Sequence, residues 1–159
     1  MKDISVLKYH EADDDTIAKL GTKAYRCEIA FGDELCYGPR GYALLVQIVF
    51  VELMKTKGRD VINDDGGGLL QLLGMSPLDT GEGSPNVYVD RAVKAVEQQI
   101  IARQLGKGYP KDELLQSLTL HDSIYFDSKT GQWIIPVIIK SVAGEASLWQ
   151  MPIGGRSSF

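Results

Sequence analysis

The sequence predicts an α+β fold: an N-terminal strand or hairpin, two main helices plus a short one, and a C-terminal antiparallel β-meander. Three observations predict it. Two long apolar or amphipathic stretches, 43–54 and 86–105, have the length of helices. Apolar and polar residues alternate in 25–31 and again after residue 117, as in half-buried strands. Turn-forming residues separate the C-terminal stretches, which is typical of strands that pair with their neighbours along the chain.

The composition fits a single globular unit. The chain has 159 residues, of which 44% are hydrophobic, and this is enough apolar material for one core. We divide it into an N-terminal strand or arm region, 1–40, a core domain, 41–151, and a C-terminal tail, 152–159.

The N-terminal region is expected to supply a half-buried strand over 25–31. Tyr25, Cys27, Ile29 and Phe31 share one face of that strand by their even spacing. A turn follows, and residues 35–37 are expected to return as the second arm of a hairpin. The acidic run at 11–15 is expected to be a solvated loop.

The first main helix is expected over 43–54. Only Gln47 and Glu52 interrupt its apolar surface, so it should be buried nearly all round. Either a partner covers part of it, or it is the central helix of the domain. A short leucine-rich helix is expected at 69–73, after a glycine-rich loop.

The longest helix is expected over 86–105, with Gly106 ending it. Asp90 and Lys94 form a supporting pair on its wet side, because residues four apart are neighbours on a helix. Its buried stripe consists of Val89, Val93, Val96 and Ile100.

The last third is expected to form the meander. A strand over 118–126 is followed by a hairpin turn at 127–131 and a strand over 133–139, and Gly144 allows a further turn into 146–151. The strand 133–139 is apolar on both faces and needs cover on both. Pro136 cannot donate a ladder hydrogen bond, so we expect it at an edge, a strand start or a bulge.

Two explanations for this two-faced strand remain open. An incoming partner strand completes an open edge of the sheet, or the strand 25–31 covers the second face within the same chain. The partner-strand explanation makes this protein an assembly component.

Charge and cysteine content exclude several other classes. The net charge of −4 and the lack of a basic run argue against nucleic-acid binding. The longest apolar run is too short to span a bilayer, and no secretory signal opens the chain, so we expect a soluble protein made in a reducing cytosol. Cys27 and Cys36 are expected to be small buried residues rather than a redox pair.

No pattern indicates an enzyme, a metal or a cofactor. The glycine-rich loop at 66–68 lacks the Lys-Ser/Thr of a phosphate-binding loop and the preceding strand of a dinucleotide fingerprint. Its aspartates do not fit a calcium loop, because an isoleucine and a glutamine occupy two ligand positions. His121 and Asp122 are adjacent, so on one strand they point to opposite faces. The acidic pairs at 33–34 and 112–113 have no catalytic spacing.

The order of elements resembles the small baseplate wedge proteins of contractile-tailed phages and related injection systems, also called sheath initiators. The resemblance covers residues from about 41 to 149 and rests on the ordered set rather than on one motif. It comprises an apolar helix ending in Thr-Lys-Gly-Arg-Asp at 56–60, then Asn-Asp-Asp-Gly-Gly-Gly-Leu at 63–69, a long helix and the strand–turn–strand. Family members carry a Glu-Pro-Arg triplet before the meander. Here Asp112 and Glu113 are followed by two leucines, so only the glutamate is kept.

The resemblance implies a structural protein without cofactor, present in six copies at the tail baseplate of a virion that is assembled in the host cytoplasm. Its implied partners are the tail sheath protein, which its C-terminal strands template, other baseplate wedge and core-bundle proteins, and the tail tube or hub. One member of this family was long labelled a lysozyme, so a lysozyme-like hydrolase is the alternative from another class, and a stand-alone cytosolic binding module is the third. The residues expected at partner contacts are Asp60, Gly66, Asp112, Glu113, Trp133, Ile134, Pro136, Ile138 and Trp149.

Overall fold

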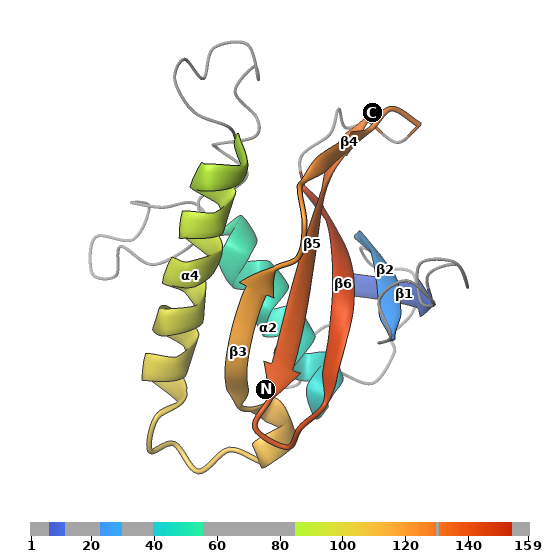
Figure 1. The fold of residues 1–159 in the computed structure, drawn as a ribbon. Helices are drawn as coiled ribbons and strands as arrows, with labels where there is room; N and C mark the ends of the chain where they lie inside the picture. The colour runs from blue at the N-terminus through green and yellow to red at the C-terminus, as the bar shows by residue number, and fades with distance from the viewer. Residues whose placement is uncertain (1–6, 12–22, 30–39, 56–84, 130, 154–159) are drawn as a thin grey trace.

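The described part of the chain forms an α+β fold of two helices and one mixed sheet (Figure 1). The computed structural model describes residues 7–11, 23–29, 40–55, 85–129 and 131–153. The elements are β1 (Leu7–Glu11), β2 (Ala24–Ile29), α2 (Tyr42–Met54), α4 (Pro85–Gln104), the 3-10 turn η1 (Lys111–Glu113), β3 (Leu115–Leu120), β4 (Tyr125–Asp127), β5 (Gln132–Ser141) and β6 (Ala146–Ile153).

The sheet has the order β1-β2-β6-β5-β3, and β4 pairs with β5 on the same side as β3. All neighbouring strands are antiparallel except β2 and β6, which are parallel. The predicted C-terminal antiparallel meander is confirmed. The sheet is larger than predicted, because the two N-terminal strands extend it beyond β6. Figure 1 shows α4 beside β3 and the β1–β2 pair at the opposite side of the sheet.

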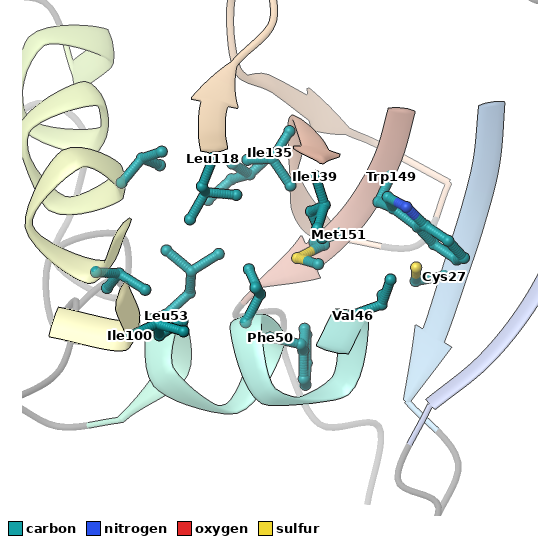
Figure 2. Close-up of a cluster of buried hydrophobic side chains, with 14 of the residues drawn as sticks. Cys27, Val46, Phe50, Leu53, Ile100, Leu118, Ile135, Ile139, Trp149 and Met151 are labelled. Atoms are coloured by element: carbon teal, nitrogen blue, oxygen red, sulfur yellow. The ribbon is translucent and has the colours of Figure 1, made fainter. Parts of the chain in front are cut away.

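One face of the sheet packs against both helices. Side chains at odd positions of β5 and β6 enter this core, where Figure 2 shows them between the strands and α2. Because β5 pairs with β6 in the register Val137↔Trp149, the even positions of both strands face away from the helices. The core members that these two strands contribute are Ile135, Val137, Ile139, Trp149 and Met151.

Helix α2 is buried nearly all round, as its composition predicts, with Val51 the exception at 46% exposed. Its buried carboxylate, Glu52, accepts hydrogen bonds of 2.6 and 3.3 Å from the guanidinium of Arg103 on α4. A two-bond pair of this kind compensates the cost of burying a carboxylate. It also joins the two helices.

Three predictions about helix α4 are confirmed: its buried stripe of apolar residues, its ion pair between Asp90 and Lys94, and its end just before Gly106. The four stripe residues are at most 2% exposed. Asp90 and Lys94 form an ion pair of 3.0 Å. The helix ends at Gln104, and Gly106 has a φ of 72°. Glycine adopts this left-handed conformation without steric cost, so it stops the helix.

The single strand predicted over 118–126 is wrong, because two strands, β3 and β4, occupy it with a break between them. Asp122 in the break has a φ of 62°, which an aspartate tolerates better than most residues. The break lies beside Pro136: the N–H of His121 donates to the carbonyl of Pro136 at 2.8 Å. Since N–H and C=O of one strand residue point to the same side, the missing donor of Pro136 also faces the break. If β3 and β4 were one continuous strand, the carbonyl opposite Pro136 would have no N–H to accept a hydrogen bond from.

Four other predictions compare with the structure as follows. Strand β6 runs to Ile153, beyond the predicted 146–151, because Pro152 pairs with Ile134. The turn at 127–131 is confirmed by a hydrogen bond of 2.8 Å from the N–H of Gly131 to the carbonyl of Asp127. The hairpin return at 35–37 and the short helix at 69–73 lie outside the described residues.

Candidate functional site

The edge of the sheet at β3 is closed by helix α4. Three side chains of α4 accept hydrogen bonds from main-chain N–H groups along this edge. The pairs are Glu97 Oε2 with Leu118 at 2.7 Å, Gln104 Oε1 with Leu115 at 2.8 Å, and Asn86 Oδ1 with Ile124 at 2.8 Å. The three acceptors are separated by about three and about two helical turns, so they share one face of the helix. Donors that an added strand would use are therefore already bound.

The spacing of acceptors and donors matches along this edge. Glu97 and Gln104 are about 10 Å apart along the helix axis, and Leu115 and Leu118 are about 10 Å apart along a strand. Residues three apart in a regular strand point their N–H groups to opposite sides. The register shift between Leu115 and Ser117 changes this alternation, so both donors face α4.

The opposite edge of the sheet is β1. This strand pairs with β2 from Leu7↔Ile29 to Glu11↔Tyr25, and in the described part of the chain it pairs with no other strand. An edge of this kind presents a row of main-chain donors and acceptors to an added strand. Among the described residues the two edges are therefore unlike: side chains of α4 close one, and no further strand or side chain is recorded on the other.

Strand β2 connects β1 to the C-terminal strands. It pairs in parallel with β6 through Ala24↔Leu148, Tyr25↔Trp149 and Arg26↔Gln150. The rings of Tyr25 and Trp149 stack at 4.5 Å. The guanidinium of Arg26 contacts a carboxylate oxygen of Asp127 at 2.6 Å, which ties β2 to the β4–β5 hairpin. Side-chain contacts on both faces thus hold this short parallel pairing.

Trp149 is part of the folded core. It is 2% exposed, and its Nε1–H donates to Tyr42 Oη at 3.0 Å. The hydroxyl of Tyr42 in turn donates to the carbonyl of Ile139 at 2.7 Å. Burial raises the pKa of Tyr42, against the opposing effect of the hydrogen bond from Trp149. The network links α2, β5 and β6, and it leaves Trp149 no surface for a partner.

Cys27 is buried in the same core, as predicted, at 2% exposed, and Cys36 lies outside the described residues. Burial raises the pKa of the Cys27 thiol from 9.0 to about 12. The unfolded chain releases this proton above about pH 9 and the folded chain only near pH 12, so this contribution to stability is intact below pH 9 and is lost as the pH rises.

We therefore expect the free energy of unfolding to fall between pH 8 and pH 10 by about 1.4 kcal/mol more in the wild type than in Cys27→Ala. Urea unfolding of both proteins at the two pH values measures this difference. An equal pH dependence of the two proteins would contradict the burial of the thiol.

The face of the sheet away from the helices contains three predicted contact residues. Ile134 is 2% exposed, Pro136 is buried and Ile138 is half-buried. Leu148, which pairs with Ile138, is also 2% exposed. The prediction that the middle strand is apolar on both faces is confirmed. The folded chain already buries most of this face, so it offers little apolar surface to a partner.

Two expectations about this strand are wrong. Pro136 lies inside a central strand rather than at an edge, a strand start or a bulge, because the break between β3 and β4 removes the need for its N–H. The strand near residue 25 does not cover the second face. It continues the sheet beside β6, and its Tyr25 and Cys27 join the helix-side core.

Asp112 and Glu113 lie at the start of helix α2. The carboxylate of Glu113 accepts a hydrogen bond of 3.2 Å from the N–H of Gly41, the residue before the helix. Gly41 has a φ of 65°, and a Cβ there would lie 2.7 Å from Asp112 Oδ2. Glycine is required for that conformation. The two carboxylates therefore have a structural role next to the N-terminus of α2, where negative charge is stabilising.

A groove of about 270 Å³ lies between α2, α4 and η1. Its polar lining is already hydrogen-bonded: Arg103 pairs with Glu52, and Gln104 bridges the carbonyl of Glu113 and the N–H of Leu115. Its apolar lining consists of Leu44, Ile48, Ile100 and the half-exposed Tyr109. The groove therefore combines an apolar lining with polar groups that are already paired.

The structure does not bring the predicted contact residues together. Trp133 packs on the exposed Phe126 at 5.6 Å near the hairpin, Trp149 lies in the core, and Glu113 lies in the groove. Asp60 and Gly66 lie outside the described residues. Neither the β1 edge nor the hydrogen-bond acceptors on α4 were predicted from the sequence. The spacing of Asn86, Glu97 and Gln104 along one face of the helix is the sequence pattern that could have identified these acceptors.

A search for metal sites, for membrane-spanning helices and for similar proteins gives no further assignment of function. Among the described residues, no cluster of three or more His, Cys, Asp or Glu is arranged to hold a metal ion. None of the described helices is both long and apolar enough to span a bilayer. Comparison of the chain with protein-family models, with curated proteins and with solved structures found no match in any of the three.

Proposed function

We propose that this protein is a structural component of a contractile-tail baseplate that starts the sheath by sharing one edge of its sheet with the sheath subunit. The difference between the two edges supports this proposal. A protein that adds one strand in one direction needs one open edge and one closed edge, since two open edges would also permit uncontrolled growth. The incoming sheath strand pairs with β1, and the C-terminal strands β5 and β6 are the rigid base for this contact.

Strand pairing suits a joint of this kind. Main-chain hydrogen bonds provide strength, while the alternation of side chains fixes the register of the incoming strand. Six copies around the tail tube or hub would present six such edges. The groove beside Glu113 is the proposed contact with other wedge and core-bundle proteins, because it combines an apolar lining with the exposed Tyr109.

Antibody labelling of purified tails tests the proposal. We expect label at the base of the tail in both sheathed and sheathless particles, since the protein joins the virion baseplate before the sheath. Absence of the chain from both kinds of particle would overturn the proposal. Lysis of cell walls by the purified protein, lost on substitution of one carboxylate, would favour the hydrolase instead.

A further inference from the structure

The parallel pairing of β2 with β6 stops halfway along both strands. Its last pair is Arg26↔Gln150, although each strand continues for three more residues. The N–H of Leu148 donates to the carbonyl of Lys23 at 2.9 Å, so the even-numbered residues of β6 direct their main-chain groups toward β2. The next donor in this row would be the N–H of Pro152, which proline lacks. The ladder between β2 and β6 therefore ends at Gln150.

Strand β2 also holds β1, because β1 pairs with no other strand in the described part of the chain. On the helix side, β2 is held by the stacking of Tyr25 on Trp149 and by the buried Cys27, which Figure 2 shows at the end of the core farthest from α4. On the other face, Arg26 forms an ion pair of 2.6 Å with Asp127 on β4. This ion pair therefore lies where the main-chain ladder ends.

We propose that the β1–β2 pair opens from β6 without unfolding of the rest of the chain, and that the ion pair between Arg26 and Asp127 is the latch that holds it closed. Five residue pairs join β1 to β2, whereas three join β2 to β6, so the contact with β6 is the one that separates. Opening moves the β1 edge. For the proposed function, on which this consequence rests, the latch sets the position of the edge that pairs with the sheath strand.

The geometry of the latch suits an interaction that can open. The Arg26 side chain is 41% exposed and the Asp127 side chain 13%, so water screens one partner more than the other. The second oxygen of Asp127, Oδ1, accepts the N–H of Lys129 at 3.0 Å, which orients the carboxylate toward Arg26. A partly exposed ion pair changes a local equilibrium by about fivefold, and this is the effect we expect from removing the latch.

Cys27 reports the opening directly. In the closed state its side chain is 2% exposed, and burial raises the pKa of its thiol to about 12. A thiol reagent attacks through the thiolate, so Cys27 reacts only after β2 has left the core. The variant Cys36→Ser leaves Cys27 as the only cysteine of the chain. Labelling of this variant with an aromatic disulfide is expected to depend less steeply on urea than global unfolding does, because local opening exposes less surface.

Two substitutions in this background remove the latch. Asp127→Asn, which keeps an oxygen for the N–H of Lys129, and Arg26→Gln are each expected to speed labelling in dilute urea about fivefold. The double variant is expected to match the single ones, because both substitutions remove the same interaction. Asp90→Asn is the matched control. It removes a carboxylate from the ion pair with Lys94 on α4 and is expected to leave the labelling rate unchanged.

The possible results separate the two parts of the proposal. Labelling with the full urea dependence of global unfolding would overturn the local opening. Single variants that label at the rate of their background, an equal acceleration by the α4 control, or a double variant whose acceleration is the product of the single ones would each overturn the latch. Every measurement uses the isolated protein, so the result is independent of whether the protein is found in purified tails, and the proposed function is tested separately.

Discussion

One of two adjacent proline substitutions in β1, Lys8→Pro or Tyr9→Pro, is expected to abolish sheath assembly while the protein stays folded. Successive residues of a strand point their N–H groups to opposite sides, so one proline removes a donor that faces β2 and the other removes a donor on the outer edge. The outward donor is the one that an incoming strand needs. Its loss has no intramolecular cost in the pairing of β1 with β2.

Each of the two proline variants is the experimental control for the other. The substitution that faces β2 breaks a ladder hydrogen bond and is expected to lower the free energy of unfolding by on the order of 1–3 kcal/mol. Urea unfolding identifies which variant this is. Assembly of sheathed tails from each variant is then counted by electron microscopy. Normal sheaths from both variants would contradict pairing at the β1 edge.

Trp149→Ala is expected to destabilise the protein by about 3–5 kcal/mol, a large part of the stability of a single domain. The substitution removes a side chain that is 2% exposed, its stacking on Tyr25 and its hydrogen bond to Tyr42. Because Tyr25 belongs to β2, we also expect faster amide exchange in β1 and β2 than in β5. Urea unfolding and hydrogen exchange measure the two effects.

Trp149→Phe is the matched control for this substitution. It keeps an aromatic ring against Tyr25 and loses the indole N–H, so its expected cost is about 1 kcal/mol. A loss below about 0.5 kcal/mol for Trp149→Ala would be typical of a surface residue and would contradict the core position of this side chain.

The elements defined by local periodicity could be predicted from the sequence. The valine stripe of α4 and the two-faced β5 both follow from the spacing of apolar residues. The break after Leu120 could not, because the four residues between β3 and β4 preserve the alternation. Leu118 and Ile124 therefore face the same core, whether or not the strand is continuous. The missing N–H of Pro136 predicts a break in the neighbouring strand only once it is known which residues pair with Pro136.

The pairing of β2 with β6 was not predictable from local pattern. More than a hundred residues separate Tyr25 from Trp149, and alternation shows that a strand is half-buried without showing which strand lies beside it. The candidate site changed for the same reason. Trp149 and Ile134 were expected at partner contacts, and they are buried within the chain instead. The β1 edge contains charged residues, which hydrophobicity does not identify.

A cryo-electron microscopy reconstruction of the tail base, with the first sheath ring in place, tests the central claim most directly. We predict that a strand of the sheath subunit is hydrogen-bonded to the outer edge of β1, and that α4 remains on β3. A sheath strand paired with β3, or a β1 edge with no strand from the sheath beside it, would contradict the account.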